Sequence, residues 1–173
     1  ITQGGRQIVG TSTELIEAIS ASASSIKVKH NNLGNGDWLH LEARGSYEAM
    51  KVTSSATSVS GGYQYSVSRN EDGTGANTWE AGDAVWNRGG SAGYGFIDQY
   101  AVEAHVDDTT ASGPSTAYMY RYGSSRNDVE PRALSGNLSG FYGYNSDTFG
   151  FAAGSFSGTW IAADAENGFR VMN

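Results

Sequence analysis

The residues best suited to acid-base or metal chemistry in this chain are its histidines. His30, His40 and His105 are the only three, and none shares a local pattern with a second ligand-type residue at metal spacing. A zinc site or a histidine-based catalytic triad needs such groups at a defined spacing or geometry. Cysteine is absent, which excludes disulfides and thiolate metal sites. The sequence therefore predicts neither zinc chemistry nor a nucleophilic triad.

Carboxylates are the second set of residues that could perform chemistry. Glycoside hydrolysis uses two carboxyl groups on either side of the scissile bond. Candidates occur at Asp98, Glu103, Asp107, Asp128 and Glu130. Any acidic surface offers such pairs, so we interpret them as solvated charges and predict that the chain is not an enzyme. A glycan-cleaving enzyme that uses Asp98, Glu103 or Asp128 is the least favoured alternative.

A loop rich in oxygen ligands follows Arg69. Asn70, Asp72, Thr74 and Asn77 could present oxygens to Ca²⁺, which takes six to eight such ligands. The loop lacks the full EF-hand spacing and its late bidentate Glu, so a plain turn is favoured. We predict no cofactor and no metal site.

Aromatic residues supply the candidate binding surface. Tyr118, Tyr120 and Tyr122 alternate with Met119 and Arg121, which places three phenols on one face of a predicted strand. Such a stripe can be a core, a subunit interface or a platform on which sugars stack. The full set of candidate binding or interface residues is Tyr118, Tyr120, Tyr122, Trp79, Trp86, Tyr142 and Tyr144.

Charge and hydropathy exclude two classes of partner. The net charge of −7 and the pI near 4.8 argue against binding nucleic acid, because phosphate binding needs a basic surface. The chain has no apolar run of membrane-spanning length, and its first residues lack the apolar core of a signal peptide. We predict no nucleic-acid partner and no membrane span.

The elements that must position these residues are short strands. The chain has 24 glycines and 2 prolines in 173 residues and is rich in aromatics, a mixture typical of many strands joined by tight turns. Alternating segments predict strands at 26–30, 37–42, 48–53, 63–67 and 82–86. These predict a small antiparallel barrel or sandwich over residues 25–89, with 26–30 and 37–42 paired as a hairpin.

The rest of the chain is expected to form a lead-in and a second β module. Residues 1–24 are a predicted lead-in or linker, in which Thr11–Glu14 fits either the start of a short helix or a strand edge. Residues 90–173 form the second module, which we also expect to be a small antiparallel barrel or sandwich and to continue beyond residue 173, so the predicted fold is all-β with two such modules in tandem. It includes predicted hairpins over 141–153 and 160–172, the latter through Asn167-Gly168.

Two groups of motifs resemble tail-fibre and tail-tip structural proteins of tailed bacteriophages. In the first half these are Val67-Ser68-Arg69-Asn70, Gly73-Thr74 and Gly82-Asp83-Ala84-Val85, with Ser25–Val28, Gly36-Asp37 and Met50–Val52 before them. In the second half they are Gly95–Asp98, Leu138–Tyr144, Thr148–Gly154 and Asp164–Val171. The motifs are short and dominated by glycine, and together they span about residues 25–172.

This resemblance implies an all-β fold, tandem modules along a homotrimeric fibre, and a place in the virion tail, outside the cell. It also implies contact with other tail structural proteins and with a host-surface glycan or protein, and it carries no catalytic residues. The alternative is a carbohydrate-binding module of a secreted or cell-surface protein, in which Tyr118, Tyr120, Tyr122 and Trp79 or Trp86 would stack on sugars.

Overall fold

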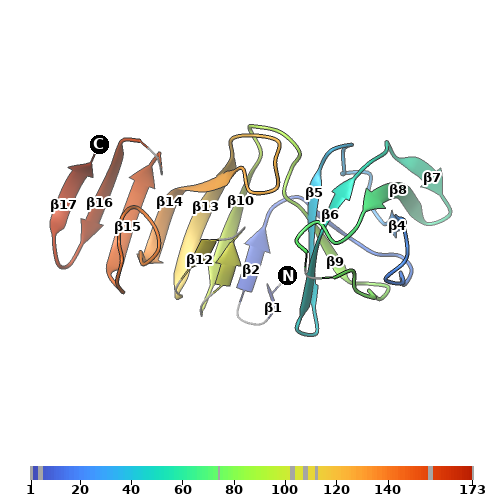
Figure 1. Ribbon diagram of the computed structural model, residues 1–173, viewed down its shortest axis with the longest axis horizontal. Helices are drawn as coiled ribbons and strands as arrows, with labels where there is room; N and C mark the ends of the chain where they lie inside the picture. Colours follow the sequence, from blue (N-terminus) through green and yellow to red (C-terminus); the bar gives the residue numbers. More distant parts are fainter. Residues whose placement is uncertain are drawn as a thin grey trace. The chain divides into compact units, whose positions relative to one another are not determined.

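The computed structural model describes residues 2–3, 6–73, 75–101, 104–106, 109–111, 113–155 and 158–172. Within these residues all regular structure is β-strand (Figure 1). The chain forms two compact units. We call Gly10–Tyr94 the barrel unit, and Ile1–Val9 with Gly95–Asn173 the sheet unit. The boundary lies close to the expected one near residue 90, but residues 1–24 are divided between the units.

The barrel unit is built from seven short strands. They are β3 (Ser12–Glu14), β4 (Ser25–Val28), β5 (Trp38–Ala43), β6 (Ser46–Val52), β7 (Thr57–Val59), β8 (Gly62–Ser68) and β9 (Ala84–Asn87). They pair antiparallel in the order β3-β9-β5-β6-β8-β4, and β7 pairs with β8. A single bridge from Leu15, just after β3, to Val28 of β4 brings the two ends together. The sheet is therefore a nearly closed barrel, which leaves little free edge.

Strand alternation places apolar side chains inside this barrel. Leu39 and Leu41 of β5, Met50 of β6 and Tyr65 of β8 are almost fully buried. Trp79 is also buried and is held by paired backbone bonds to Ile19. The short strands predicted from alternation between residues 26 and 86 are thus confirmed as strands.

A buried carboxylate ties the loop after β8 to the barrel wall. Glu48 is fully buried, and its oxygens accept hydrogen bonds from Arg69 Nε (2.7 Å), Arg69 Nη2 (2.8 Å) and Trp79 Nε1 (2.8 Å). The backbone N–H groups of Asn70 and Asn77 also donate to it. Burial alone would raise the pKa of Glu48, but these hydrogen bonds outweigh burial and lower it. The Arg69-Asn70 motif has a structural role here.

One pairing predicted in the barrel unit is wrong, and one open alternative is decided. The strand predicted from Ile26, which is β4, pairs with β8 rather than with β5, and β5 instead forms a hairpin with β6. Of the two alternatives for Thr11–Glu14, the strand edge is confirmed, because Ser12–Glu14 is strand β3 and pairs with β9. Both pairings join segments distant in sequence, which local patterns do not specify.

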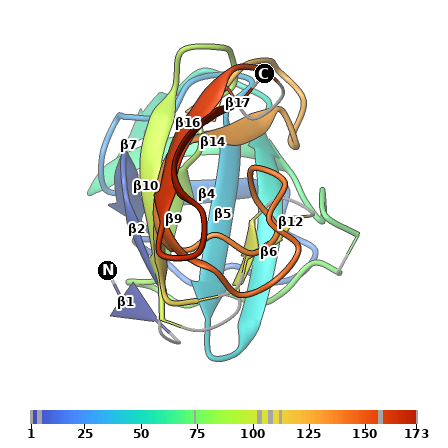
Figure 2. The same cartoon turned by 90° about the vertical axis from the view of Figure 1, so that its left-hand side faces the viewer.

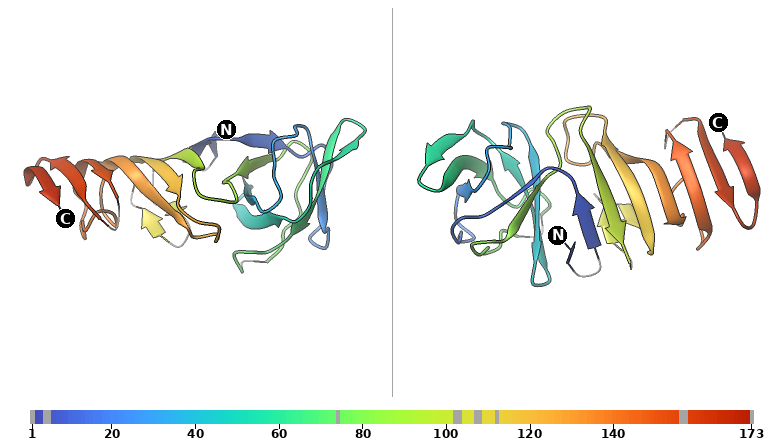
Figure 3. Two further views of the ribbon diagram at one scale, coloured as in Figure 1. Left: turned by 90° about the horizontal axis from the view of Figure 1, so that it is seen from above. Right: turned by 180° about the vertical axis from the view of Figure 1, so that it is seen from behind.

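The sheet unit is an open antiparallel sheet of eight strands. They are β1 (Thr2–Gln3), β2 (Arg6–Val9), β10 (Gly95–Tyr100), β13 (Ser115–Arg121), β14 (Val129–Asn137), β15 (Phe149–Gly154), β16 (Trp160–Asp164) and β17 (Gly168–Met172), in that order. A separate hairpin joins β11 (Ala104–Val106) and β12 (Thr109–Ala111). Strands β10, β13, β14, β15, β16 and β17 lie side by side in one layer (Figure 3), and in the view from the β17 end they overlap one behind another (Figure 2). A barrel or sandwich was predicted, so this unit corrects the expected architecture.

One face of the open sheet is covered by the chain itself. Ala117, Leu134, Ala152 and Ala162 lie in register on this face and are fully buried. The segment 138–148, between β14 and β15, supplies buried side chains of Leu138, Phe141, Tyr142 and Tyr144. We call this the covered face. It is the hydrophobic core of the sheet unit.

Hydrogen bonds hold segment 138–148 against the covered face. The Tyr142 hydroxyl donates to the Pro131 carbonyl at 2.9 Å, and its ring packs against Trp160. The Tyr144 hydroxyl donates to Asp164 Oδ2 at 2.5 Å, and Arg170 bonds to both Tyr144 and Asp164. The Tyr144 hydroxyl, followed by the Asn167 side chain and the Asn167 and Glu166 backbone N–H groups, donates hydrogen bonds to Asp164 that outweigh its burial and lower the pKa of that carboxyl.

The two predicted hairpins of this unit have different outcomes. Asp164 pairs with Gly168 across a three-residue loop, so the β16–β17 hairpin is confirmed. Gly168 has φ of 68°, the left-handed conformation that such a loop needs. The predicted hairpin over 141–153 is wrong, because 138–148 is used to cover the sheet. No helix within the described ranges is long and apolar enough to cross a membrane.

Candidate functional site

The uncovered side of the sheet unit is the most unusual surface of the molecule. Along β13, buried Ser115, Ala117 and Met119 alternate with Thr116 and Tyr118, which point to the opposite side. We call that opposite side the open face. Its composition follows from the strand register, because cross-strand partners share a face of a sheet.

One row of cross-strand partners on the open face is apolar over seven strands. From β2 to β17 it consists of Val9, Ile97, Tyr118, Ala133, Ala153, Ile161 and Val171. Val171 is 64% exposed and Tyr118 is 50% exposed. A solvent-facing strand position is usually polar, so a continuous apolar row makes this face a candidate contact surface.

The adjacent row changes character half-way across the sheet. It consists of Gln7, Gln99, Thr116, Ser135, Phe151, Ala163 and Phe169. The first four residues carry amides or hydroxyls, and the last three are apolar, with Phe169 69% exposed. The open face is therefore apolar and aromatic toward β17 and polar along this row toward β2.

The exposed apolar area of this face is large. At roughly 200 Å² per aromatic residue and somewhat less per aliphatic one, the exposed fractions of its members correspond to about 700 Å² of exposed residue surface. The members are Val9, Tyr118, Tyr122, Phe151, Ile161, Phe169 and Val171, which we call the apolar patch. An ordinary monomer exposes about 300 to 600 Å² in its largest apolar patch, so this one is comparable to the upper end of that range.

The tyrosine stripe contributes to the open face as the alternation predicted. Tyr118 and Tyr122 are about half exposed, so the interpretation of the stripe as a core is wrong. Tyr120 is half-buried beneath the Arg132 guanidinium, which lies 4.9 Å from its ring centroid. Arg132 also pairs with Glu130 at 2.8 Å. The charged groups beside the stripe thus neutralise each other.

The other predicted binding residues are packed inside the units. Trp79 and Trp86 are buried in the barrel unit, and Tyr142 and Tyr144 are buried on the covered face of the sheet unit. Trp79 donates to Glu48, and burial with the nearby Glu130 charge raises the pKa of Tyr142 to about 12. Their rings are therefore occupied in packing rather than presented to a ligand.

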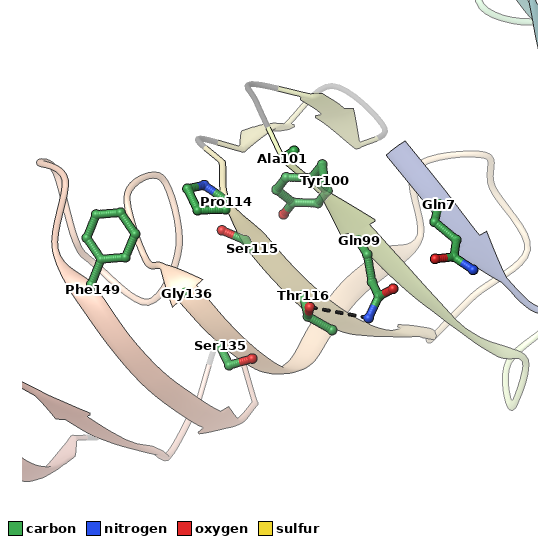
Figure 4. Close-up of a pocket in the computed structure, with 10 residues that line it drawn as sticks. All are labelled: Gln7, Gln99, Tyr100, Ala101, Pro114, Ser115, Thr116, Ser135, Gly136 and Phe149. Atoms are coloured by element: carbon green, nitrogen blue, oxygen red, sulfur yellow. Dashed lines mark hydrogen bonds between the residues drawn. The ribbon is translucent and has the colours of Figure 1, made fainter. Parts of the chain in front are cut away.

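A shallow pocket lies at the polar end of the open face and extends around the ends of β10 and β13 (Figure 4). Its volume is about 600 Å³ and it is open to solvent. It is lined by Gln7, Gln99, Tyr100, Ala101, Pro114, Ser115, Thr116, Ser135, Gly136 and Phe149. Phe149 and Gln7 stand at opposite ends of this group (Figure 4). We call it the uncharged pocket, because none of these ten residues is ionisable near neutral pH.

The three described carboxylates among those considered for catalysis, Asp98, Asp128 and Glu130, lie in different local environments. Asp98 is buried and in register with Ala117 on the covered face, whereas Glu130 pairs with Arg132 beside Tyr120. Asp128 accepts a hydrogen bond from the Ser125 backbone in a turn. Glu103 and Asp107 lie outside the described residues.

The histidines and the candidate calcium loop also have local roles. His30 contacts Thr13, and His40 lies 3.1 Å from Glu42 and beside Trp86. His105 lies in β11 of the other unit. In the loop, Asn70 Oδ1 accepts from Gly75 N and Asp72 Oδ2 from Ala49 N, while Thr74 lies outside the described residues. No cluster of three or more acidic or histidine ligands occurs in the part of the chain that the structure describes.

Comparison with known proteins does not assign the chain to a family. No protein-family model and no curated protein matches this sequence. The interpretation of the chain therefore rests on its residues and its geometry.

The sequence did not reveal the polar residues of the uncharged pocket. Gln7 and Gln99 become neighbours only because β2 pairs with β10, a contact between residues far apart in the chain. Thr116 and Ser135 become neighbours only because β13 pairs with β14, and local alternation does not give cross-strand register. Phe149 was part of an aromatic-glycine-aromatic step, the one signal that could have drawn attention to it.

Proposed function

We propose that this chain is a non-catalytic structural and attachment module of a bacteriophage tail fibre or tail tip, assembled as a homotrimer on the outside of the virion. The observation that carries this proposal is the apolar patch. Its area of about 700 Å² is close to the ~800 Å² that each partner contributes to a standard protein interface. A second copy of the chain is the partner we propose for it.

The charge distribution supports a second copy of the chain as the partner of the apolar patch. The chain carries a net charge of −7, so two copies repel each other over most of their surface. Every member of the apolar patch is uncharged, and the neighbouring Glu130 and Arg132 form a pair. A second acidic chain can therefore pack against this face without burying an uncompensated charge of the patch.

A trimer fits the motifs that resemble tail-fibre proteins. In a cyclic trimer each copy uses two different surfaces, so the apolar patch of one copy would contact another part of the next copy. A fibre also needs stability and binding surfaces rather than catalytic groups. The scattered carboxylates and the structural histidines agree with that requirement.

The test is the solution mass of the whole chain, measured by light scattering after size-exclusion chromatography. We expect three times the chain mass for the wild type. The double substitution Phe169→Ser/Val171→Ser should yield folded monomers, because both side chains are exposed and neither belongs to the hydrophobic core of a unit. Tyr47→Ser is the matched control, since Tyr47 is 46% exposed in the barrel unit, and should leave the trimer intact. A wild-type monomer would refute the assembly.

A further inference from the structure

The described residues that line the uncharged pocket carry no charge, although the protein as a whole is acidic. The chain has 18 acidic and 11 basic residues, yet none of the ten residues that line the pocket is among them. Proteins recognise phosphate and carboxylate groups with Arg or Lys, and hold cations with carboxylates. A ligand that fits this lining is therefore neutral.

The hydrogen-bonding capacity of the lining residues further restricts the class of ligand. Gln7 and Gln99 each offer two N–H donors and a carbonyl acceptor, and the Thr116 and Ser135 hydroxyls both donate and accept. Gln99 Nε2 reaches Thr116 Oγ1 only at 3.5 Å, so both groups retain capacity for a ligand. Groups that donate and accept equally well complement a polyhydroxylated molecule, whose own hydroxyls do the same.

The spacing of these side chains suits an extended ligand. They occupy four neighbouring strands in register, about 4.8 Å apart, which spans roughly 15 Å. That length accommodates about three sugar rings. The pocket is shallow and open, as expected for a chain that passes across the sheet rather than a small molecule that is enclosed.

Phe149 supplies an apolar contact at one end of the pocket. It is 54% exposed, and Figure 4 shows its ring at the opposite end of the lining from Gln7. An aromatic ring beside polar groups can stack on the C–H face of a sugar while the amides bind its hydroxyls. No carboxylate lines the pocket among the described residues, so it lacks the pair needed to hydrolyse a glycoside.

We infer that the uncharged pocket binds a neutral oligosaccharide, with Gln7, Gln99, Thr116 and Ser135 holding hydroxyls and Phe149 stacking on a ring. This inference rests on the proposed attachment function and names the ligand class of that function. Tyr118, Tyr120 and Tyr122, the tyrosines considered for sugar stacking from sequence, are not part of this site.

The test uses the full chain and a printed array of neutral oligosaccharides built from glucose, galactose, mannose and N-acetylhexosamines, beside sialylated and uronic-acid glycans. The best neutral hit is then titrated by calorimetry. Gln99→Ala/Thr116→Ala and, separately, Phe149→Ala should each weaken binding at least tenfold. Tyr47→Ala, at an exposed position of the barrel unit outside both the pocket and the apolar patch, should bind as the wild type does.

Several results would overturn the inference. They are a folded wild type that binds no neutral glycan, binding confined to acidic glycans, or neutral binding that survives Phe149→Ala. Phe149 is exposed, so this variant is expected to fold even if the double variant does not. Light scattering on the same samples separates the two proposals: a monomer that binds glycan refutes the trimer alone, and a trimer without glycan binding refutes the pocket alone.

Discussion

The barrel unit and the sheet unit are both made from short strands, yet they differ in how many large apolar side chains they leave exposed. In the barrel unit the sheet nearly closes, and its large apolar side chains turn inward around Leu41 and Trp79. In the sheet unit the strands stay in one layer, and only one face is covered. Of the eleven large apolar side chains exposed among the described residues, only Tyr47 and Tyr94 belong to the barrel unit.

The comparison shows how the same strand alternation serves two purposes. A closed sheet satisfies its own edges and its own apolar face, so it needs no partner. An open sheet has to leave one face to solvent or to another molecule. The open face carries exposed apolar and aromatic side chains, which is the reason we propose it as a contact surface.

The largest effect should come from breaking the buried ion pair of the barrel unit. Arg69→Ala leaves the Glu48 carboxylate buried without its cation, which costs about 3 to 5 kcal/mol of unfolding free energy. Denaturation followed by tryptophan fluorescence measures it, since three of the four tryptophans lie in this unit. Lys29→Ala, at an exposed pair with Glu14, is the control and should change little. Equal stability of both variants would contradict a structural role for the Arg69 pair.

The two faces of the sheet unit should respond differently to truncation. Leu134→Ala on the covered face removes a fully buried side chain and should cost about 2 to 5 kcal/mol. Ile161→Ala on the open face, where the side chain is 36% exposed, should cost well under half of that. Both are measured by urea denaturation in the Phe169→Ser/Val171→Ser background, where assembly does not contribute. Similar losses at the two positions would show that the open face is packed within a single chain.

Acid should weaken the barrel unit through Glu48. Its pKa is lower in the folded state than the ordinary value of 4.5, so the unfolded chain binds the proton more readily. The stabilisation is therefore complete above about pH 5 and is lost as the pH falls through the folded-state value. Melting temperatures between pH 7 and pH 3 measure this loss. Glu48→Gln should start less stable and show a shallower decline; an unchanged slope would assign the acid sensitivity to other carboxylates.

The smallest effect concerns the Tyr142 hydroxyl under the covered face. Tyr142→Phe removes its hydrogen bond to Pro131 and should cost about 1 kcal/mol. The folded-state pKa of about 12 exceeds the ordinary 10, so the wild type should lose stability as the pH rises between these values. The variant should lose less over the same interval. Melting curves at pH 9 and pH 11 make the comparison, and parallel curves would place the alkaline sensitivity elsewhere.

Local sequence signals determined the class and many of the strands. Alternation at Tyr63, Tyr65 and Val67 marked β8, and Asn167-Gly168 marked the final hairpin. Alternation also placed the three tyrosines on one side of β13. These features depend on neighbours within a few residues, which is why sequence alone could supply them.

Tertiary structure decided which strands pair and which faces are covered. Pairing of β2 with β10 brings Gln7 beside Gln99, and pairing of β4 with β8 replaces the hairpin expected at Ile26. Segment 138–148 covers one face of the open sheet and leaves the other face exposed. The physical reason is that cross-strand register is set by contacts between distant segments. The residue types determined which side chains each strand carries. Only the tertiary structure determined which of those side chains are exposed to solvent and which are buried in a core.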